Sequence, residues 1–174
     1  LHRVLDIVLE NIDIPVQDID LLMGEEKRII LEQFNDTTRE YPRDASVDRL
    51  FVNQVAQTPD RVAIIGSGGS LTYRELERLS SLFARNLRSH GAVPNSIAAV
   101  MLERGIQMAV GVLAILKAGA AYLPISPFYP VNRRNYMLKD SNCPVLVTVP
   151  RFLNDAGAAL PGIHVVDIDD ENAY

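Results

Sequence analysis

The sequence predicts an α/β fold, in which a parallel sheet carries helices on both faces. From residue 62 onward, short apolar segments alternate with helical patterns, and this alternation is typical of parallel strands joined by helical, right-handed crossovers. Residues 97–102 are also apolar almost without a break, as expected for a strand that is buried on both faces of a sheet.

The composition is that of a folded domain. The chain has 174 residues, of which 48% are hydrophobic and 22% charged, and its formal net charge is −5. This length supports one core of ordinary size. A negative chain without a long basic run is not expected to bind nucleic acid, and no apolar stretch reaches the roughly 20 residues that span a bilayer. The single cysteine, Cys143, excludes an internal disulfide and fits a reducing cytoplasm.

The N-terminal segment, residues 1–44, is expected to be a helical and extended linker. Apolar residues at helical spacing predict a helix over 1–12, and residues 24–34 predict a second, short helix. Residues 35–43 are polar and contain proline, as a linker would. We therefore place a domain boundary near Asp44.

Residues 45–174 are predicted to form the α/β domain. Strands are expected at 62–65, 97–102, 120–125, 145–149 and 163–166, with a hairpin return at 70–71. Helices are expected after an N-cap at Ser46, after Thr72, and over 108–118, 132–140 and 152–159. The chain begins at Leu1 rather than Met, inside a helical pattern, so we expect it to be a piece of a longer polypeptide.

The most apolar stretch is expected at the centre of the domain. Residues 108–116 carry no charged or hydrogen-bonding side chain, and a helix that is apolar all round is buried on all sides. Lys117 suits the negative end of the helix dipole, and Gly119 stands where helices commonly turn left-handed and stop. Residues 120–125 then predict a short, buried, central strand.

The clearest local signal is a capping box at the start of a helix. Thr72 is an N-cap residue, and Glu75 follows three residues later. Leu71 and Leu76 flank the cap at the positions of a hydrophobic staple. We expect this helix to end at Gly91.

No set of residues in the sequence combines a nucleophile, a base and an oxyanion site. The segment Gly66–Gly69 lacks the Lys-Ser/Thr ending of a phosphate loop and is interpreted as a hairpin turn. The three histidines, His2, His90 and His164, lie far apart in the sequence on different elements, and structural roles are favoured for them.

The remaining polar groups of the sequence have simple structural interpretations. Cys143 is interpreted as a small buried group rather than a nucleophile. The acidic residues 167–171 are interpreted as a solvated turn rather than a cation site. One of Arg133 and Arg134 is expected on the wet face of a helix, and Glu103 and Arg104 follow a strand, where parallel sheets place functional loops.

The order of two motifs resembles the adenylation domains of nonribosomal peptide synthetases. Leu71-Thr-Tyr-Arg-Glu-Leu76 resembles the first core motif, and Leu116-Lys-Ala-Gly-Ala-Ala-Tyr-Leu-Pro-Ile-Ser126 resembles the second. The family usually has aspartate where this chain has Ser126. The motif residues with expected structural roles are Leu71, Thr72, Tyr73, Glu75, Leu76, Leu116, Lys117, Ala118, Gly119, Tyr122 and Pro124.

The upstream segment also resembles this family. Residues 18–22, 26–28 and 34–37 look like the segment that joins a condensation domain to the adenylation domain after it. The resemblance therefore implies that residues 1–44 are the end of a condensation domain or its linker, and that 45–174 are the N-terminal portion of an adenylation domain.

The resemblance implies a cytoplasmic, multidomain ligase of secondary metabolism. The parent would activate an amino acid with ATP and Mg²⁺ as an aminoacyl adenylate, and would load it onto the phosphopantetheine of a carrier domain. Its partners would be an upstream condensation domain, the rest of the adenylation domain and a downstream carrier domain. The phosphate loop and the later ATP-binding positions are expected beyond Tyr174. We therefore expect no catalytic, cofactor-binding or metal-binding residue in this chain, and no activity of the chain alone.

Two other functions stay open at this stage. The parent could be an acyl-CoA or aryl-acid ligase of the same AMP-forming superfamily, which shares the first motif. Alternatively, residues 1–44 could be a docking surface on a non-catalytic interaction module.

Overall fold

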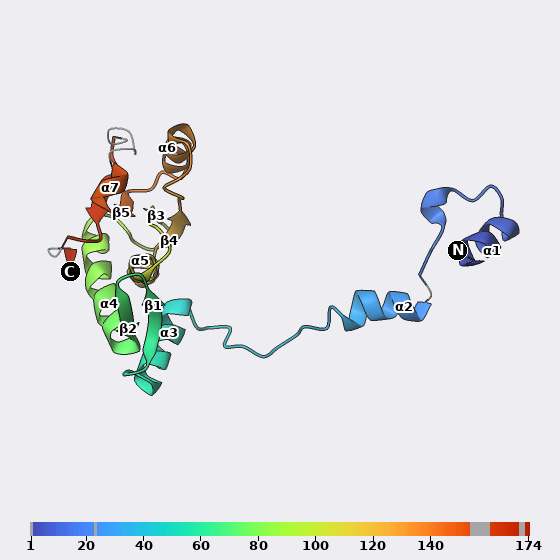
Figure 1. Cartoon of the computed structure of the whole chain (residues 1–174), viewed down its shortest axis with the longest axis horizontal. Coiled ribbons are helices and arrows are strands. Elements are labelled where there is room, and N and C mark those ends of the chain that lie inside the picture. Colours follow the sequence, from blue (N-terminus) through green and yellow to red (C-terminus); the bar gives the residue numbers. More distant parts are fainter. Residues whose placement is uncertain (1, 23, 154–160, 171–172) are drawn as a thin grey trace. The chain divides into compact units, whose positions relative to one another are not determined.

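The computed structural model describes residues 2–22, 24–153, 161–170 and 173–174. Contacts between residues divide the chain into two compact units, residues 1–43 and 44–174 (Figure 1). The division falls beside Asp44, where the sequence places the boundary. The identity of the first unit as a condensation-to-adenylation linker stays a prediction.

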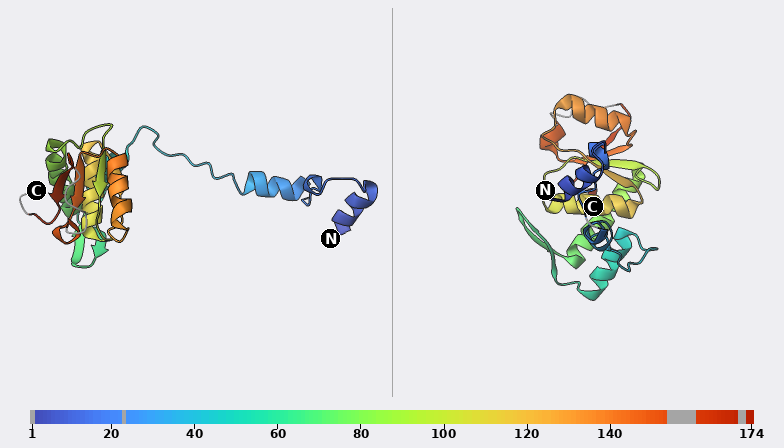
Figure 2. Two further views of the ribbon diagram at one scale, coloured as in Figure 1. Left: turned by 90° about the horizontal axis from the view of Figure 1, so that it is seen from above. Right: turned by 90° about the vertical axis from the view of Figure 1, so that its right-hand side faces the viewer.

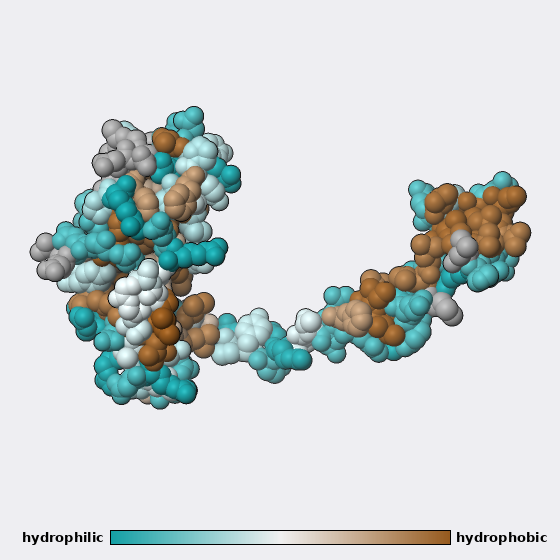
Figure 3. Space-filling view, viewed as in Figure 1, coloured by the Kyte–Doolittle hydropathy of each residue, from teal (hydrophilic) through white to brown (hydrophobic). Residues whose placement is uncertain are grey.

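The first unit contains short helical elements, and none of its residues that the structure describes is buried. They are α1 (His2–Glu10), the 3₁₀ turn η1 (Val16–Asp18), α2 (Gly24–Arg28) and its π-helical continuation η2 (Ile29–Gln33). Apolar side chains stand out in water, with Leu9, Ile12 and Val16 83%, 84% and 86% exposed. Figure 3 shows this apolar surface in brown over the unit.

The second unit is built on a parallel, four-stranded sheet with the order β4-β3-β5-β6. Its strands are β3 (Ile97–Val100), β4 (Ala121–Pro124), β5 (Val145–Thr148) and β6 (His164–Asp167). In the register, Ala99 of β3 lies opposite Leu123 of β4 and Leu146 of β5. The helices are α3 (Val47–Gln57), α4 (Tyr73–Ser89), α5 (Ile106–Ala118), α6 (Val131–Asp140) and α7 (Pro150–Leu153).

Helices cover both faces of the sheet, which confirms the predicted fold class. Successive side chains of a strand point to opposite faces. Val100 and Val147 therefore join one core cluster with α4 and α5, while Ala99 and Leu146 join a second cluster with Leu138 of α6. Figure 2 (right) shows α5 and α6 on opposite sides of the strands.

The predicted hairpin is also present. Strands β1 (Val62–Gly66) and β2 (Gly69–Thr72) pair antiparallel. Gly68 and Gly69 have φ angles of 104° and 130°, a region that glycine enters without steric cost. The glycine-rich segment is therefore a turn, as interpreted, and not a phosphate loop.

The prediction of a central, buried strand at residues 120–125 is wrong. Among the described strands, β4 stands at the edge of the sheet, because the strand order places it outside β3. Tyr122 is 46% exposed as a result, although Ala120 and Ile125 at the strand's two ends are buried.

Two helix predictions also need correction. Helix α5 is not buried on all sides, since its buried residues are confined to Val110, Gly111, Ala114, Ile115 and Ala118. The N-cap of α3 is at Ser46 as expected, but its side chain makes no capping hydrogen bond. The helix expected over 152–159 is α7, described as far as Leu153; residues 154–160 lie outside the described part of the chain.

Candidate functional site

The second motif segment meets the helix that the first motif begins, where α5 contacts α4. Helix α4 begins at Tyr73 because the predicted capping box forms. The hydroxyl of Thr72 accepts the N–H of Glu75 at 3.2 Å, and the Glu75 carboxylate accepts the N–H of Thr72 at 2.8 Å. The Thr72 N–H, followed by its hydroxyl, lowers the pKa of the Glu75 carboxyl.

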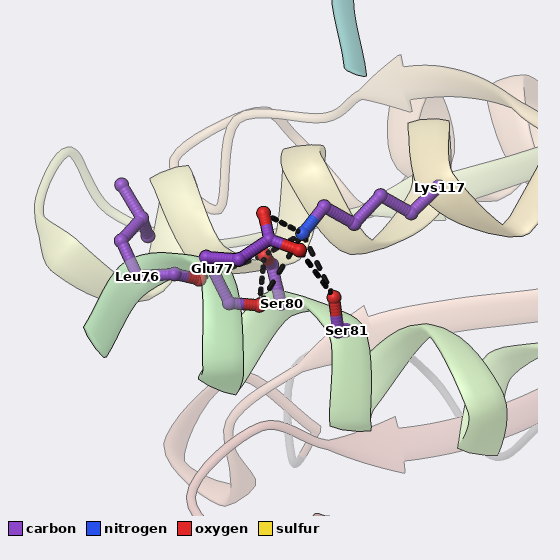
Figure 4. A network of polar contacts seen from close by, with 5 residues as sticks. All are labelled: Leu76, Glu77, Ser80, Ser81 and Lys117. Carbon is purple, nitrogen blue, oxygen red and sulfur yellow. Dashed lines mark hydrogen bonds and ion pairs between the residues drawn. The ribbon is translucent and has the colours of Figure 1, made fainter. Parts of the chain in front are cut away.

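Lys117 of the second motif reaches across to α4, the helix that the first motif begins (Figure 4). Its Nζ donates to Glu77 Oε2 at 2.5 Å, to Ser80 Oγ at 2.8 Å and to Ser81 Oγ at 3.0 Å, and lies 3.3 Å from the Glu77 carbonyl. The Lys117 side chain is only 9% exposed and that of Glu77 27%. Few water molecules therefore compete with this ion pair.

The serines pass these hydrogen bonds on to α4 itself. Ser80 Oγ donates to the Leu76 carbonyl at 2.7 Å, and Ser81 Oγ donates to Glu77 Oε1 at 2.9 Å. The three hydrogens of the ammonium thus face four acceptors, and an ammonium has only three hydrogens to donate. The Lys117 ammonium is fully engaged in this contact, and a structural rather than catalytic role for it stays a prediction.

The role predicted for Lys117 changes with this geometry. The sequence placed it in the last turn of its own helix, which is confirmed, with the helix dipole as its partner. The structure instead gives Lys117 partners on α4. Its Nζ also lies over the ring of Phe51, 5.5 Å from the ring centroid. Phe51 in turn packs on Tyr73, with ring centroids 5.9 Å apart.

Arg88 completes the contact from the opposite direction, and the sequence analysis missed it. From the last turn of α4, its Nε donates to the Ala118 carbonyl at 3.3 Å, and its Nη2 donates to the Lys117 carbonyl. These carbonyls lack partners within helix α5. We call Glu77, Ser80, Ser81, Arg88 and Lys117 the reciprocal clamp, because each helix supplies a cation to the other.

Gly119 ends α5 as predicted, in the left-handed conformation with φ of 95°. A Cβ atom at this position would lie 3.0 Å from Cγ of Pro94. The conformation and the close contact both require glycine here.

The other motif residues occupy the surroundings of the clamp or strand β4. Leu76 and Ala118 are buried, Leu71 and Leu116 are partly buried, and Tyr122 and Pro124 are exposed on β4. The motif residues therefore divide into a packed group at the helices and an open group on the edge strand.

The carboxyl edge of the sheet, where parallel sheets commonly bind ligands, is hollowed at two places. Glu103 and Arg104, the predicted loop residues, border both hollows. One of about 250 Å³ also includes Ser67, Gln107 and Arg151. The other, of about 450 Å³, is lined by apolar residues of the loop 124–129. Arg151 forms an exposed ion pair with Glu103 at 2.5 Å.

Three other predicted groups have structural positions. Arg133 is exposed, as expected for one of the pair, whereas Arg134 is buried and donates to the Pro127 carbonyl at 3.2 Å. The Arg133 guanidinium lies over the Tyr129 ring at 4.3 Å. Cys143 is buried, as interpreted.

The acidic segment 167–171 forms a turn over the part that is described. The N–H of Asp169 donates to Asp167 Oδ1 at 2.9 Å, and Gln107 of α5 donates to Asp169 Oδ1. Glu171 lies outside the described residues. Within the described ranges, no three His, Cys, Asp or Glu side chains are placed to hold a metal ion.

The structure brings together two histidines that the sequence left apart. The rings of His90 and His164 stack with centroids 3.7 Å apart and planes 9° from parallel. The third histidine, His2, is exposed in the first unit. No local pattern pointed to this pair, because 74 residues separate its members in the sequence.

Comparisons with known proteins agree with the resemblance noted in the sequence. The model of the family described as "AMP-binding enzyme" matches residues 51–173. The chain is 42% identical over 173 residues to gramicidin S synthase 2 of Brevibacillus brevis. The aligned region covers 99% of this chain and 4% of the synthase. The chain thus spans a small fraction of that relative's length.

Solved structures show the same fold. A crystal structure of the nonribosomal peptide synthetase FmoA3, bound to α-methyl-L-serine-AMP, matches 97% of this chain and 20% of its own, with a TM-score of 0.75 and 28% identity. The N-terminal subdomain of Klebsiella oxytoca NpsA, solved with 3-hydroxybenzoyl-AMSN, matches 71% of this chain and 30% of its own, with a TM-score of 0.59 and 26% identity. In the described part of the chain, no helix has the length and apolarity needed to cross a membrane.

Proposed function

Since this chain belongs to the AMP-binding enzyme family and is homologous to the adenylation domains of nonribosomal peptide synthetases, we propose that it forms the N-terminal scaffold of an amino-acid adenylation domain. The observation that carries the proposal is the reciprocal clamp, which joins the second family motif to α4, the helix that the first motif begins. In this proposal the motif residues hold the sheet and do not contact the reacting atoms.

The proposed parent activates an amino acid with ATP, forms an aminoacyl adenylate, and transfers the acyl group to the phosphopantetheine of a carrier domain. The sequence similarity to a peptide synthase over nearly the whole chain supports this reaction. ATP supplies the adenylyl group and Mg²⁺ neutralises its phosphates. Within the described residues no three His, Cys, Asp or Glu side chains are placed to hold a metal ion, and the absence of ATP- and Mg²⁺-binding residues from this chain stays a prediction.

Pyrophosphate exchange tests this activity. The parent polypeptide, extended through the rest of its adenylation domain, is expected to exchange pyrophosphate into ATP with one amino acid or a few. The 174-residue chain alone is expected to show none. Exchange by the chain alone would contradict the scaffold role, and a parent inert with every amino acid and acyl acid would contradict the adenylation role.

An aryl-acid ligase is a second candidate, which the similarity to NpsA favours. The same assay separates the two functions, because an aryl-acid ligase exchanges pyrophosphate with benzoic acids and not with amino acids. We place amino acids first, because the chain is 42% identical to a peptide synthase and 26% identical to NpsA.

For the first unit, we propose a linker that packs on an upstream condensation domain. The support is its row of exposed apolar side chains, Leu9, Ile12 and Val16, which water solvates poorly. Binding to the isolated condensation domain of the same parent, measured by calorimetry, is expected for the intact chain and not for Leu9→Ser. Asp13→Ser, on the same segment, is the matched control. Equal binding by both variants would refute this docking surface.

A further inference from the structure

The stacked histidines lie at the amino edge of the sheet, at the opposite end of the strands from the two hollows of the carboxyl edge. His90 is the C-cap residue of α4, and His164 is the first residue of β6. Neither belongs to the reciprocal clamp or to either motif. A role for the pair must therefore come from its own surroundings.

The backbone on both sides of the stack is fixed. The N–H of His164 donates to the Pro144 carbonyl at 2.8 Å. Gly91, next to His90, has φ of 95°, and a Cβ atom there would lie 3.1 Å from Cβ of the same proline. Pro144 thus lies against the backbone beside both rings, at the place where the end of α4 meets the start of β6.

Hydrogen bonds define the tautomer of the neutral His90 ring. Its Nδ1 lies 2.9 Å from the Asn86 carbonyl and 3.1 Å from Asn86 Oδ1, with Ser89 Oγ at 3.4 Å. A carbonyl only accepts, so Nδ1 of the neutral ring carries the hydrogen and Nε2 does not.

Two carboxylates among the described residues share a hollow with the stack. Asp167, at the end of β6, and Asp170, in the turn after it, line a hollow of about 170 Å³ together with both rings and Asn86. These carboxylates favour a first positive charge at the pair. Two imidazolium rings at 3.7 Å, in contrast, repel each other directly.

We propose that the His90–His164 stack is a joint that accepts one proton and opens on the second. With one proton, a cationic ring lies on a neutral one, which is an attractive arrangement. With two protons the rings separate, and the end of α4 loses its contact with the start of β6. This makes the attachment of β6 dependent on pH.

The electrostatics of His164 agree with this geometry. Desolvation by its surroundings, and after it the charge of His90, lowers the pKa of His164 below its ordinary 6.5. A histidine whose folded pKa is depressed costs no stability above the unfolded pKa. Below it, the unfolded state binds the proton more readily, and stability falls. The expected loss therefore sets in below pH 6.5.

Proton NMR of the whole chain between pH 8 and pH 5 tests the joint directly. The Hε1 resonance of His164 is expected to titrate at lower pH than that of the exposed His2, which serves as an internal reference. In His90→Phe, which keeps a ring but cannot be charged, the midpoint of His164 is expected to move up. Coincident midpoints for His164 and His2 would overturn the proposal, as would a His164 midpoint that His90→Phe leaves unchanged.

Urea unfolding over the same pH range tests the consequence. The unfolding midpoint of the wild type is expected to fall as the pH drops below 6.5, and His164→Phe is expected to flatten this dependence. His2→Gln is the matched control and should keep the wild-type slope. A wild-type slope in His164→Phe would overturn the proposed link between the stack and stability, and the NMR result stands on its own if that variant fails to fold.

Discussion

The two ends of helix α5 carry ion pairs of the same length in different surroundings. At the C-terminal end, Lys117 pairs with Glu77 at 2.5 Å with 9% and 27% of the side chains exposed. Beside the N-terminal end, Arg151 pairs with Glu103 at 2.5 Å with 61% and 45% exposed. Since water and salt weaken exposed pairs, the distance alone does not measure the contribution of either pair.

The backbone repeats this contrast. Gly119 after the helix is left-handed and touches Pro94, whereas Gly105 before the helix is extended, with φ of 165°, and a Cβ atom there would meet nothing within 4 Å. The C-terminal end of α5 is therefore fixed by α4 and its neighbours. The N-terminal end is open and borders the hollows at the carboxyl edge of the sheet.

The largest effect is expected from Lys117→Met. The substitution keeps an unbranched side chain, one atom shorter, but leaves the Glu77 carboxylate without its cation. Losing one partner of a buried pair costs about 3–5 kcal/mol, and the partial exposure of Glu77 reduces the expected loss to about 3 kcal/mol. Urea unfolding followed by circular dichroism measures the free energy. Arg151→Met is the matched control at the open end, with an expected loss below about 1 kcal/mol. Equal losses would remove the contrast between the two ends.

A smaller loss, about 2 kcal/mol, is expected from Gly119→Ala. A left-handed alanine costs about 1–2 kcal/mol, and its methyl group would also press on the Pro94 ring. Gly105→Ala at the other end is expected to cost less than about 1 kcal/mol, because its extended backbone suits any residue and only the N-cap preference is lost. Thermal unfolding of both variants measures which substitution lowers stability more. A larger loss for Gly105→Ala than for Gly119→Ala would contradict this prediction.

Capping extends the contrast from α5 to the starts of two neighbouring helices. Thr72→Ala is expected to lose about 1 kcal/mol, because the Thr72 hydroxyl accepts the Glu75 N–H. Ser46→Ala is expected to lose close to nothing, since the Ser46 side chain makes no capping bond in α3. The denaturant midpoints of the two variants, measured against the wild type, compare these losses of stability. Similar losses for Thr72→Ala and Ser46→Ala would mean that Ser46 caps its helix in solution.

The smallest effect is expected from the charge of Glu75. Its pKa is lowered in the folded state by the N–H and hydroxyl of Thr72. The contribution of Glu75 to stability is therefore present above the unfolded pKa, near 4.5, and is lost as the pH falls. Glu75→Gln keeps a capping side chain but has no charge to titrate, so acid titration of its unfolding midpoint should be flatter than that of the wild type. Parallel curves would contradict the assignment.

Features that depend on neighbouring residues could be predicted from the sequence. The capping box needs only the side chains of Thr72 and Glu75, and the hairpin needs only its glycines. The fold class followed from the alternation of elements, because crossover rules leave few topologies for such a pattern.

Features that depend on strand order or on distant partners could not be predicted. The sequence of β4 is as apolar as that of an inner strand, and only the order of the sheet places Tyr122 at the edge. Lys117 and Glu77 are 40 residues apart in the sequence, so no local pattern indicated their ion pair. The helix dipole alone accounted for a cation at this position. Arg88 ended an amphipathic helix and gave no sign that it would bond to another helix.

Gly111 defines how close α5 lies to the sheet. A Cβ atom there would meet Ile168 at 3.4 Å, and Leu102 and Val147 at 3.6 Å. These are ordinary contacts, so alanine fits while a branched side chain would lift the helix from the strands. During evolution, this position is therefore expected to accept only glycine or alanine. A larger residue would require smaller neighbours at the same time, which makes Gly111 and the three residues around it a set that is expected to vary together.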